Sequence, residues 1–155
     1  MLFLLFQIGN ERYVLEASRV VEVLPLVELK KIPQAPRGCA GVLNYRGVPV
    51  AALDLCQLTL GQPASERLST RIILIKYVSG EGRECLVGLI AEKVTDMVRK
   101  NPSDFADPGF RASAAPSLGP LLLDAAGAIQ WIRTEHLLTE QFRELAFSET
   151  PHAIQ

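Results

Sequence analysis

The hydrophobic positions of this 155-residue chain fall into short runs, and turn-forming residues separate most of these runs. Where two such runs meet at a tight turn, the pattern predicts a β-hairpin. Three hairpins are predicted in this way, and a further pair of extended apolar runs meets at Arg46-Gly47. The predicted hairpins join 2–8 to 12–16, 71–78 to 84–90, and 118–124 to 128–133, and the further pair is 40–45 and 48–53.

The segments between these hairpins are less regular. Residues 17–25 are predicted to form a helical turn and then a strand that Pro25 ends, and residues 93–100 are predicted to continue as strand. The Pro-rich stretch 33–38 cannot continue a central strand ladder, because proline has no backbone N–H to donate. Residues 101–120 are rich in Pro, Ser, Ala, Asp and Gly, and they are predicted to form the longest loop.

Helical spacing of apolar residues occurs in two places. The segment 54–61 carries leucines at short spacing and ends in Gly61, which predicts a short helix. The segment 134–147 repeats apolar residues with helical periodicity, and Thr134 is its predicted N-cap. The remaining residues, 148–155, are expected to form a flexible tail.

Many short strands, frequent turns and one terminal helix are typical of small β-barrels. No strand–helix–strand repeat is evident in the sequence, so the predicted barrels are antiparallel. The spacing of the strands allows two similar barrels. The chain length fits one domain, which we expect over residues 1–147.

Composition narrows the classes of function. Hydrophobic residues make up 48% of the chain, and the mean hydropathy is +0.19. Two explanations fit this value: apolar surface kept for partners, or a well-filled core. The net charge of −1 argues against nucleic-acid binding. No apolar stretch reaches the length of a membrane span, and the opening residues lack the features of a signal peptide, so a cytoplasmic protein without membrane insertion is expected.

The reactive residue types are sparse and scattered. The three cysteines, Cys39, Cys56 and Cys85, lie in apolar surroundings without metal-type spacing, which is typical of inert core thiols. The two histidines, His136 and His152, have no ligand-type neighbours. The sequence contains neither a nucleophile elbow nor a phosphate-binding glycine loop. We therefore expect no enzyme, no metal and no cofactor.

One arginine stands out in the stretch "GVLNYRGVPVAALDL", residues 41–55. Taken alone, Arg46 fits a solvated turn residue at a strand end. However, the series Ile-Pro-x-x-Pro, Gly-Val-x-Asn-x-Arg-Gly and Asp-Leu surrounds it. With "FQIGNERYVLEASRVVEVL" before it and "GLIAEKVTDMV" after it, this series resembles the CheW family, the coupling proteins of bacterial chemosensory arrays. The resemblance runs in order over about residues 3–145.

The resemblance implies a fold and a role. The implied fold is all-β, with two small SH3-like antiparallel five-stranded β-barrels that share a hydrophobic core, and a C-terminal helix. The implied role is that of a non-catalytic adaptor, associated with membrane receptor arrays through protein contacts. Its implied partners are the regulatory domain of a chemotaxis-type histidine kinase and the cytoplasmic hairpin tip of chemoreceptors, with other coupling proteins as further candidates.

The resemblance also implies a site. Arg46 is expected to form an ion pair with Glu22 that holds two strands in register beside a receptor groove between the barrels. For Val20 and Val23 a core position is an equal alternative, and Gly41 and Asn44 also fit turn geometry. The implied groove residues are Val20, Glu22, Val23, Gly41, Asn44, Tyr45, Arg46, Gly47 and Gly88.

Several residues depart from the family pattern. Tyr45 stands where an aliphatic residue is usual, the proline common at Ala51 occurs instead at Pro49, and Glu92 replaces a common aspartate. Trp131 is expected either to anchor a partner or to fill the end of the second barrel. The alternative function is a small β-barrel module that binds a peptide or ligand outside any chemosensory array.

Overall fold

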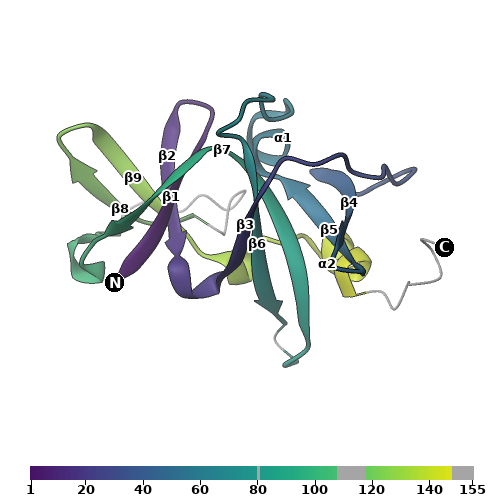
Figure 1. Cartoon of the computed structure of the whole chain (residues 1–155). Coiled ribbons are helices and arrows are strands. Elements are labelled where there is room, and N and C mark those ends of the chain that lie inside the picture. Colours follow the sequence, from purple (N-terminus) through teal and green to yellow (C-terminus); the bar gives the residue numbers. More distant parts are fainter. Residues whose placement is uncertain (80, 108–117, 148–155) are drawn as a thin grey trace.

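The computed structural model describes residues 1–79, 81–107 and 118–147, and the predicted tail together with half of the predicted 101–120 loop lies outside these ranges. The described residues form nine strands and two α-helices (Figure 1). The strands are β1 (Leu2–Ile8), β2 (Glu11–Glu16), β3 (Val20–Pro25), β4 (Cys39–Tyr45), β5 (Val48–Asp54), β6 (Arg71–Val78), β7 (Glu84–Arg99), β8 (Leu118–Asp124) and β9 (Gly127–Ile132). The helices are α1 (Leu55–Leu60) and α2 (Glu140–Phe147).

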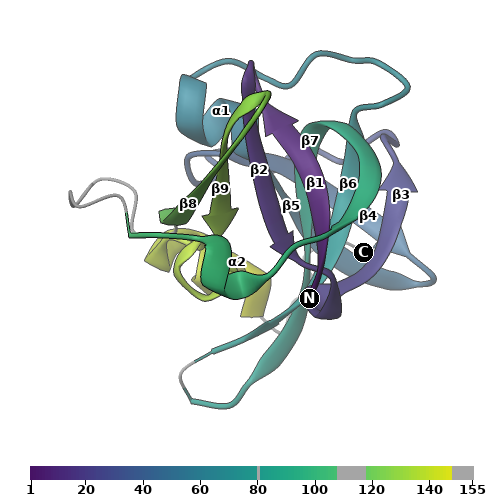
Figure 2. The same ribbon diagram turned by 90° about the vertical axis from the view of Figure 1, so that its left-hand side faces the viewer.

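Two five-stranded units share the long strand β7. Its first half pairs with β6 and β5, and its second half pairs with β1. The strand order is β3-β6-β7-β5-β4 in one unit and β7-β1-β2-β9-β8 in the other. Figure 1 shows the two units on either side of β7, and Figure 2 looks onto the β8–β9 side with the other unit behind it. The predicted two-barrel, mostly β architecture and all of the predicted hairpins are confirmed.

Two of the strand pairings differ from the antiparallel prediction. Strand β5 runs parallel to β7, with Ala51 opposite Val87, and β2 runs parallel to β9, with Arg12 opposite Ile129. The sheet is therefore mixed. In each case the two parallel strands are far apart in the sequence. The long segment between them returns the chain to the end of the sheet at which the first strand began, so the second strand runs in the same direction.

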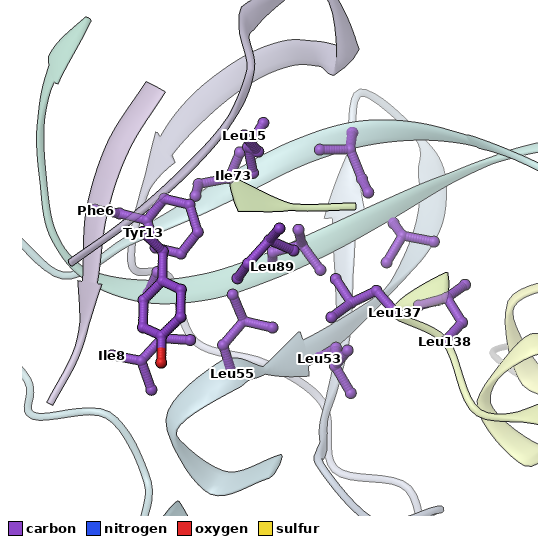
Figure 3. Close-up of a cluster of buried hydrophobic side chains, with 14 of the residues drawn as sticks. Phe6, Ile8, Tyr13, Leu15, Leu53, Leu55, Ile73, Leu89, Leu137 and Leu138 are labelled. Carbon is purple, nitrogen blue, oxygen red and sulfur yellow. The ribbon is translucent and has the colours of Figure 1, made fainter. Parts of the chain in front are cut away.

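The apolar runs are buried on both faces. Along β6, Ile73 and Ile75 point into a core shared by the two barrels, whereas Ile72 and Leu74 point into the interior of their own barrel. Figure 3 shows the shared core, which gathers side chains from β1, β2, β5, β6 and β7. Because both faces of these strands are covered, their sequences are apolar without alternation. The high hydropathy therefore reflects a filled core more than an exposed surface.

Trp131 belongs to the interior of the other barrel. Its ring makes edge contacts with Phe3, at 4.9 Å between ring centroids, and with Phe105, at 5.3 Å. Phe3 and Phe105 are buried together with Ile129. Of the two roles expected for Trp131, the structure supports the filling of this barrel.

The C-terminal helix is shorter than predicted, and Thr134 is not its N-cap. Residues Thr134–His136 form a separate 3-10 turn, and α2 begins at Glu140. The hydroxyl of Thr139 accepts the N–H of Phe142 at 3.2 Å and caps α2. Both Leu137 and Leu138 are buried in the shared core. Leu137 and Leu138 lie between the 3-10 turn and α2, and this connection packs against the core together with Phe142 of α2.

No helix within the described ranges is both long enough and apolar enough to cross a membrane.

Candidate protein-interaction site

The β4–β5 hairpin ends in a two-residue turn, Arg46-Gly47. Both residues have positive φ, 51° for Arg46 and 85° for Gly47, which is the geometry of a type I′ turn. The side chain of Asn44 closes the turn by accepting the N–H of Gly47 at 2.7 Å. An arginine in the left-handed region costs about 1–2 kcal/mol relative to glycine. Strain of this kind is often kept where a side chain serves a function.

Two side chains of this hairpin converge on Glu22 of β3. The hydroxyl of Tyr45 donates a hydrogen bond to Glu22 Oε1 at 2.8 Å. The Nη2 of Arg46 lies 3.3 Å from the same oxygen. The Arg46 guanidinium also lies over the Tyr45 ring, with Cζ 5.1 Å from the ring centroid. These three residues form what we call the Glu22 cluster.

The Glu22 cluster spans a seam in the barrel. The ladders between described residues pair β3 with β6 and β4 with β5, and an isolated bridge joins Lys30 to Val42. Side chains from β3 and from the end of β4 therefore meet across strands that are not ladder partners. The implied Glu22–Arg46 contact is present in the structure, and Tyr45 joins it.

The ion pair is solvated. The Arg46 side chain is 76% exposed and that of Glu22 is 38% exposed. An ion pair in this setting contributes little to stability, because water screens the charges. The hydrogen bond from Tyr45 raises the pKa of its own hydroxyl above 10.0, since it favours the protonated form next to the carboxylate. Tyr45 is thus a stronger candidate than Arg46 for holding Glu22 in place.

A β-bulge separates the other expected groove residues from this cluster. The register between β3 and β6 shifts between Val20 and Glu22. Val20 and Val23 are half-buried and pack against the shared core. Glu22 instead reaches Tyr45, which packs against the interior of the β3–β6 barrel. The expected residues therefore divide between two faces of β3.

Two glycines of the expected groove, Gly41 and Gly88, are buried. Gly41 has a φ of 141°, and a Cβ atom there would lie 2.5 Å from the carbonyl oxygen of Lys30. A Cβ atom on Gly88 would lie 2.9 Å from Cγ2 of Ile72. Both glycines allow close packing inside the barrel, which gives each of them a structural role.

Two exposed valines adjoin the cluster in the sequence and were not expected. Val21, at the bulge, is 48% exposed, and Val48, which pairs with Tyr45 across the turn, is 49% exposed. Sequence patterns gave no signal for Val21, because only the bulge turns it outward. The turn that carries the Arg46 cation is thus followed directly by an exposed apolar residue, Val48.

Two observations on the described residues concern metal ligands and thiols. They contain no group of three or more His, Cys, Asp or Glu side chains that could hold a metal ion. Burial raises the pKa of the Cys56 thiol to about 12 and that of Cys85 to about 11. Both thiols are therefore protonated near neutral pH and are poor nucleophiles.

A polar pocket of about 280 Å³ is present near α1, and Glu92 lines it. The Glu92 carboxylate accepts the backbone N–H of Gly9 and of Ser65, each at 3.0 Å, and the thiol of Cys56 at 3.4 Å. One carboxylate thus accepts hydrogen bonds from three separate segments of the chain. These three donors from within the protein occupy the Glu92 carboxylate, so we interpret Glu92 as a structural residue.

The chain resembles known proteins over most of its length. The CheW-like domain family matches residues 2–142. The chemotaxis protein CheW of Klebsiella aerogenes is 29% identical over 96 residues, 62% of this chain and 55% of the relative. That of Helicobacter pylori is 24% identical over 103 residues, 66% of this chain and 59% of the relative. The aligned segments thus span less than two thirds of these relatives.

A solved structure shows the same fold. The scaffolding protein TtCheW from Thermoanaerobacter tengcongensis superposes with a TM-score of 0.74 at 22% identity, covering 86% of this chain and 84% of the other. The superposition covers most of the chain that forms the two barrels. The family match over residues 2–142 spans these barrels and the residues of the Glu22 cluster, and the chain therefore belongs to the CheW-like domain family.

Proposed function

We propose that this protein is a non-catalytic adaptor that couples chemoreceptors to a chemotaxis-type histidine kinase. The observation that carries the proposal is the family match over residues 2–142, which includes both barrels and not an isolated motif. The Cys56 and Cys85 thiols, which are protonated near neutral pH, agree with a binding role. The partners proposed are the kinase regulatory domain and the cytoplasmic hairpin tip of the receptors.

The Glu22 cluster is the proposed receptor contact. It lies at an exposed hairpin end, it is held by hydrogen bonds, and it keeps a strained arginine at its tip. A rigid, charged projection of this kind binds with a small entropy cost. The half-buried Val20 and Val23, on the other face of β3, are proposed as an apolar margin of the same contact region.

Co-sedimentation tests the proposal. Membranes that contain a chemoreceptor are mixed with the histidine kinase and this protein, and the pellet is assayed for all three. We expect the wild-type protein to pellet with the receptor and to increase the kinase in the pellet. Arg46→Glu should lose this effect.

A matched control is available in the β6–β7 hairpin. Lys76 forms an ion pair with Glu84 at 3.2 Å, and both side chains are 54% exposed. Lys76→Glu makes the same change of charge at a similar solvated pair, and it should pellet as the wild type does. If the wild-type protein stays in the supernatant with every receptor and kinase tested, the proposal is wrong and a peptide- or ligand-binding module becomes the better description.

A further inference from the structure

Tyr45 and Arg46 share one acceptor, and their contacts with it are unequal. The Tyr45 hydroxyl lies 2.8 Å from Glu22 Oε1, a normal length for a hydrogen bond from a hydroxyl to a carboxylate. The Arg46 Nη2 lies 3.3 Å from the same oxygen, longer than the 2.7–2.9 Å typical of a charged N–H to a carboxylate. Tyr45 is therefore the principal partner of Glu22.

We infer that Tyr45 occupies Glu22 and thereby leaves the Arg46 guanidinium available to bind a carboxylate on the receptor. This inference rests on the proposed function, and it changes the role of Arg46. The arginine becomes a specificity-determining contact, and Tyr45 becomes the residue that positions it.

The arginine is both available and oriented. Of the described side chains, Glu22 is the one hydrogen-bond partner of the guanidinium, which has five N–H donors. Its side chain is 76% exposed. The contact with the Tyr45 ring, 5.1 Å from Cζ to the centroid, orients the guanidinium plane without using its N–H donors.

A carboxylate is the group that fits these donors. A guanidinium binds a carboxylate through two parallel hydrogen bonds, a geometry that a lysine could not supply. The exposed Val48 beside the turn adds apolar contact, so the matching receptor surface is an acidic side chain next to an aliphatic one. Glu22 still carries a negative charge and competes with an incoming carboxylate for Arg46. That competition gives the inference its sharpest test.

The test measures binding of a purified receptor hairpin-tip fragment by calorimetry, with four variants. Arg46→Gln should weaken binding by about tenfold, the scale of a hydrogen bond between charged groups. Glu22→Gln keeps an oxygen that accepts from Tyr45 but removes the competing charge, so it should bind as tightly as the wild type or more tightly. Tyr45→Phe keeps the ring, frees Glu22 to take Arg46, and should weaken binding several-fold. Adding Glu22→Gln to Tyr45→Phe should restore it.

A second set of measurements identifies the receptor group. Acidic residues of the fragment are changed to amides one at a time, and one of these changes should weaken binding of the wild type but not of Arg46→Gln. Lys76→Gln serves as the charge control, and circular dichroism with thermal melting verifies that each variant is folded.

The outcomes separate the two proposals. If the wild type binds but Glu22→Gln is as weak as Arg46→Gln, the two residues act as a pair and this inference is wrong, while the proposed function stands. The same holds if Arg46→Gln binds as the wild type does, or if no acidic residue couples to Arg46. If the wild type binds no receptor fragment, the proposed function fails and this inference fails with it.

Discussion

The Tyr45 hydroxyl lies 2.8 Å from Glu22 Oε1 and is closer to that oxygen than the Arg46 Nη2, which lies at 3.3 Å. The family resemblance implies an arginine–glutamate pair, and the structure adds a tyrosine that makes the shorter bond. Tyr45 is one of the residues that depart from the family pattern. The departure therefore falls on a residue that decides how the Glu22 cluster is held.

The hydrogen bond should be visible in the titration of Tyr45. Because the carboxylate of Glu22 favours the protonated hydroxyl, the pKa of Tyr45 lies above its ordinary value of 10.0. In Glu22→Gln the negative charge is removed, so the pKa of Tyr45 should fall toward that value. NMR titration of the tyrosine ring carbons measures the change. An unchanged pKa of Tyr45 in Glu22→Gln would show that the two residues do not interact in solution.

The two contacts should also differ in their effect on stability. Tyr45→Phe removes a hydrogen bond across the β3–β4 seam and should lower the urea midpoint of unfolding. Arg46→Gln removes a solvated ion pair and relieves no strain, so its midpoint should stay close to that of the wild type. Because a raised pKa means that the protonated hydroxyl stabilises the fold, the effect of Tyr45→Phe should persist below pH 10 and vanish as the pH rises through the pKa of Tyr45.

Gly88 should behave as a core residue. A methyl group at Gly88 would meet Cγ2 of Ile72 at 2.9 Å and Cδ2 of Leu43 at 3.3 Å. Gly88→Ala should therefore lower the free energy of unfolding by about 1–3 kcal/mol, through overpacking. The folded fraction should still bind the receptor fragment with wild-type affinity. If Gly88→Ala had wild-type stability but bound the receptor fragment weakly, Gly88 would instead be part of the binding surface.

Glu92 should stabilise the protein in a pH-dependent manner. Partial burial raises the pKa of Glu92, but the hydrogen bonds from Ser65, Cys56 and Gly9 together outweigh it and hold the pKa below its usual 4.5. Glu92→Gln has one carbonyl oxygen in place of two carboxylate oxygens, so it should cost about 1 kcal/mol at neutral pH.

The sign of the pKa shift defines the pH range of this effect. A lowered pKa means that the charged form stabilises the fold, so the contribution is present above about pH 4.5 and is lost as the pH falls through the lowered value. Urea unfolding at pH 7 and pH 3 should show a difference between wild type and Glu92→Gln that shrinks at the lower pH. The exposed Glu66, which follows Ser65 in the chain, provides a control as Glu66→Gln. An equal difference at both pH values would contradict the account.

Local features of the fold follow from the sequence because they depend on neighbouring residues. The hairpins at Gly9 and at Arg46-Gly47 and the short helix ending at Gly61 combine apolar runs with turn chemistry, and each is present. The parallel pairing of β2 with β9 depends on contacts between residues far apart in the chain. Hydrophobic periodicity carries no signal for it.

The site was predictable only in part, for a similar reason. The resemblance brought Glu22 and Arg46 together, and their contact is present. It did not separate Val20 from Glu22, because a single-residue bulge in β3 turns them to different faces and bulges leave little trace in a sequence. Nor did it show that Gly88 is buried, since a glycine suits an exposed turn and a crowded interior equally well.

The most direct test of the central claim is receptor-dependent kinase activity. Autophosphorylation of the histidine kinase is measured with receptor-containing membranes, in the presence of the wild-type protein, Arg46→Glu or Lys76→Glu. We predict that the wild type and Lys76→Glu make the kinase responsive to the receptor and that Arg46→Glu does not. Kinase activity that is the same with and without the wild-type protein would contradict the proposal that this chain is a coupling adaptor.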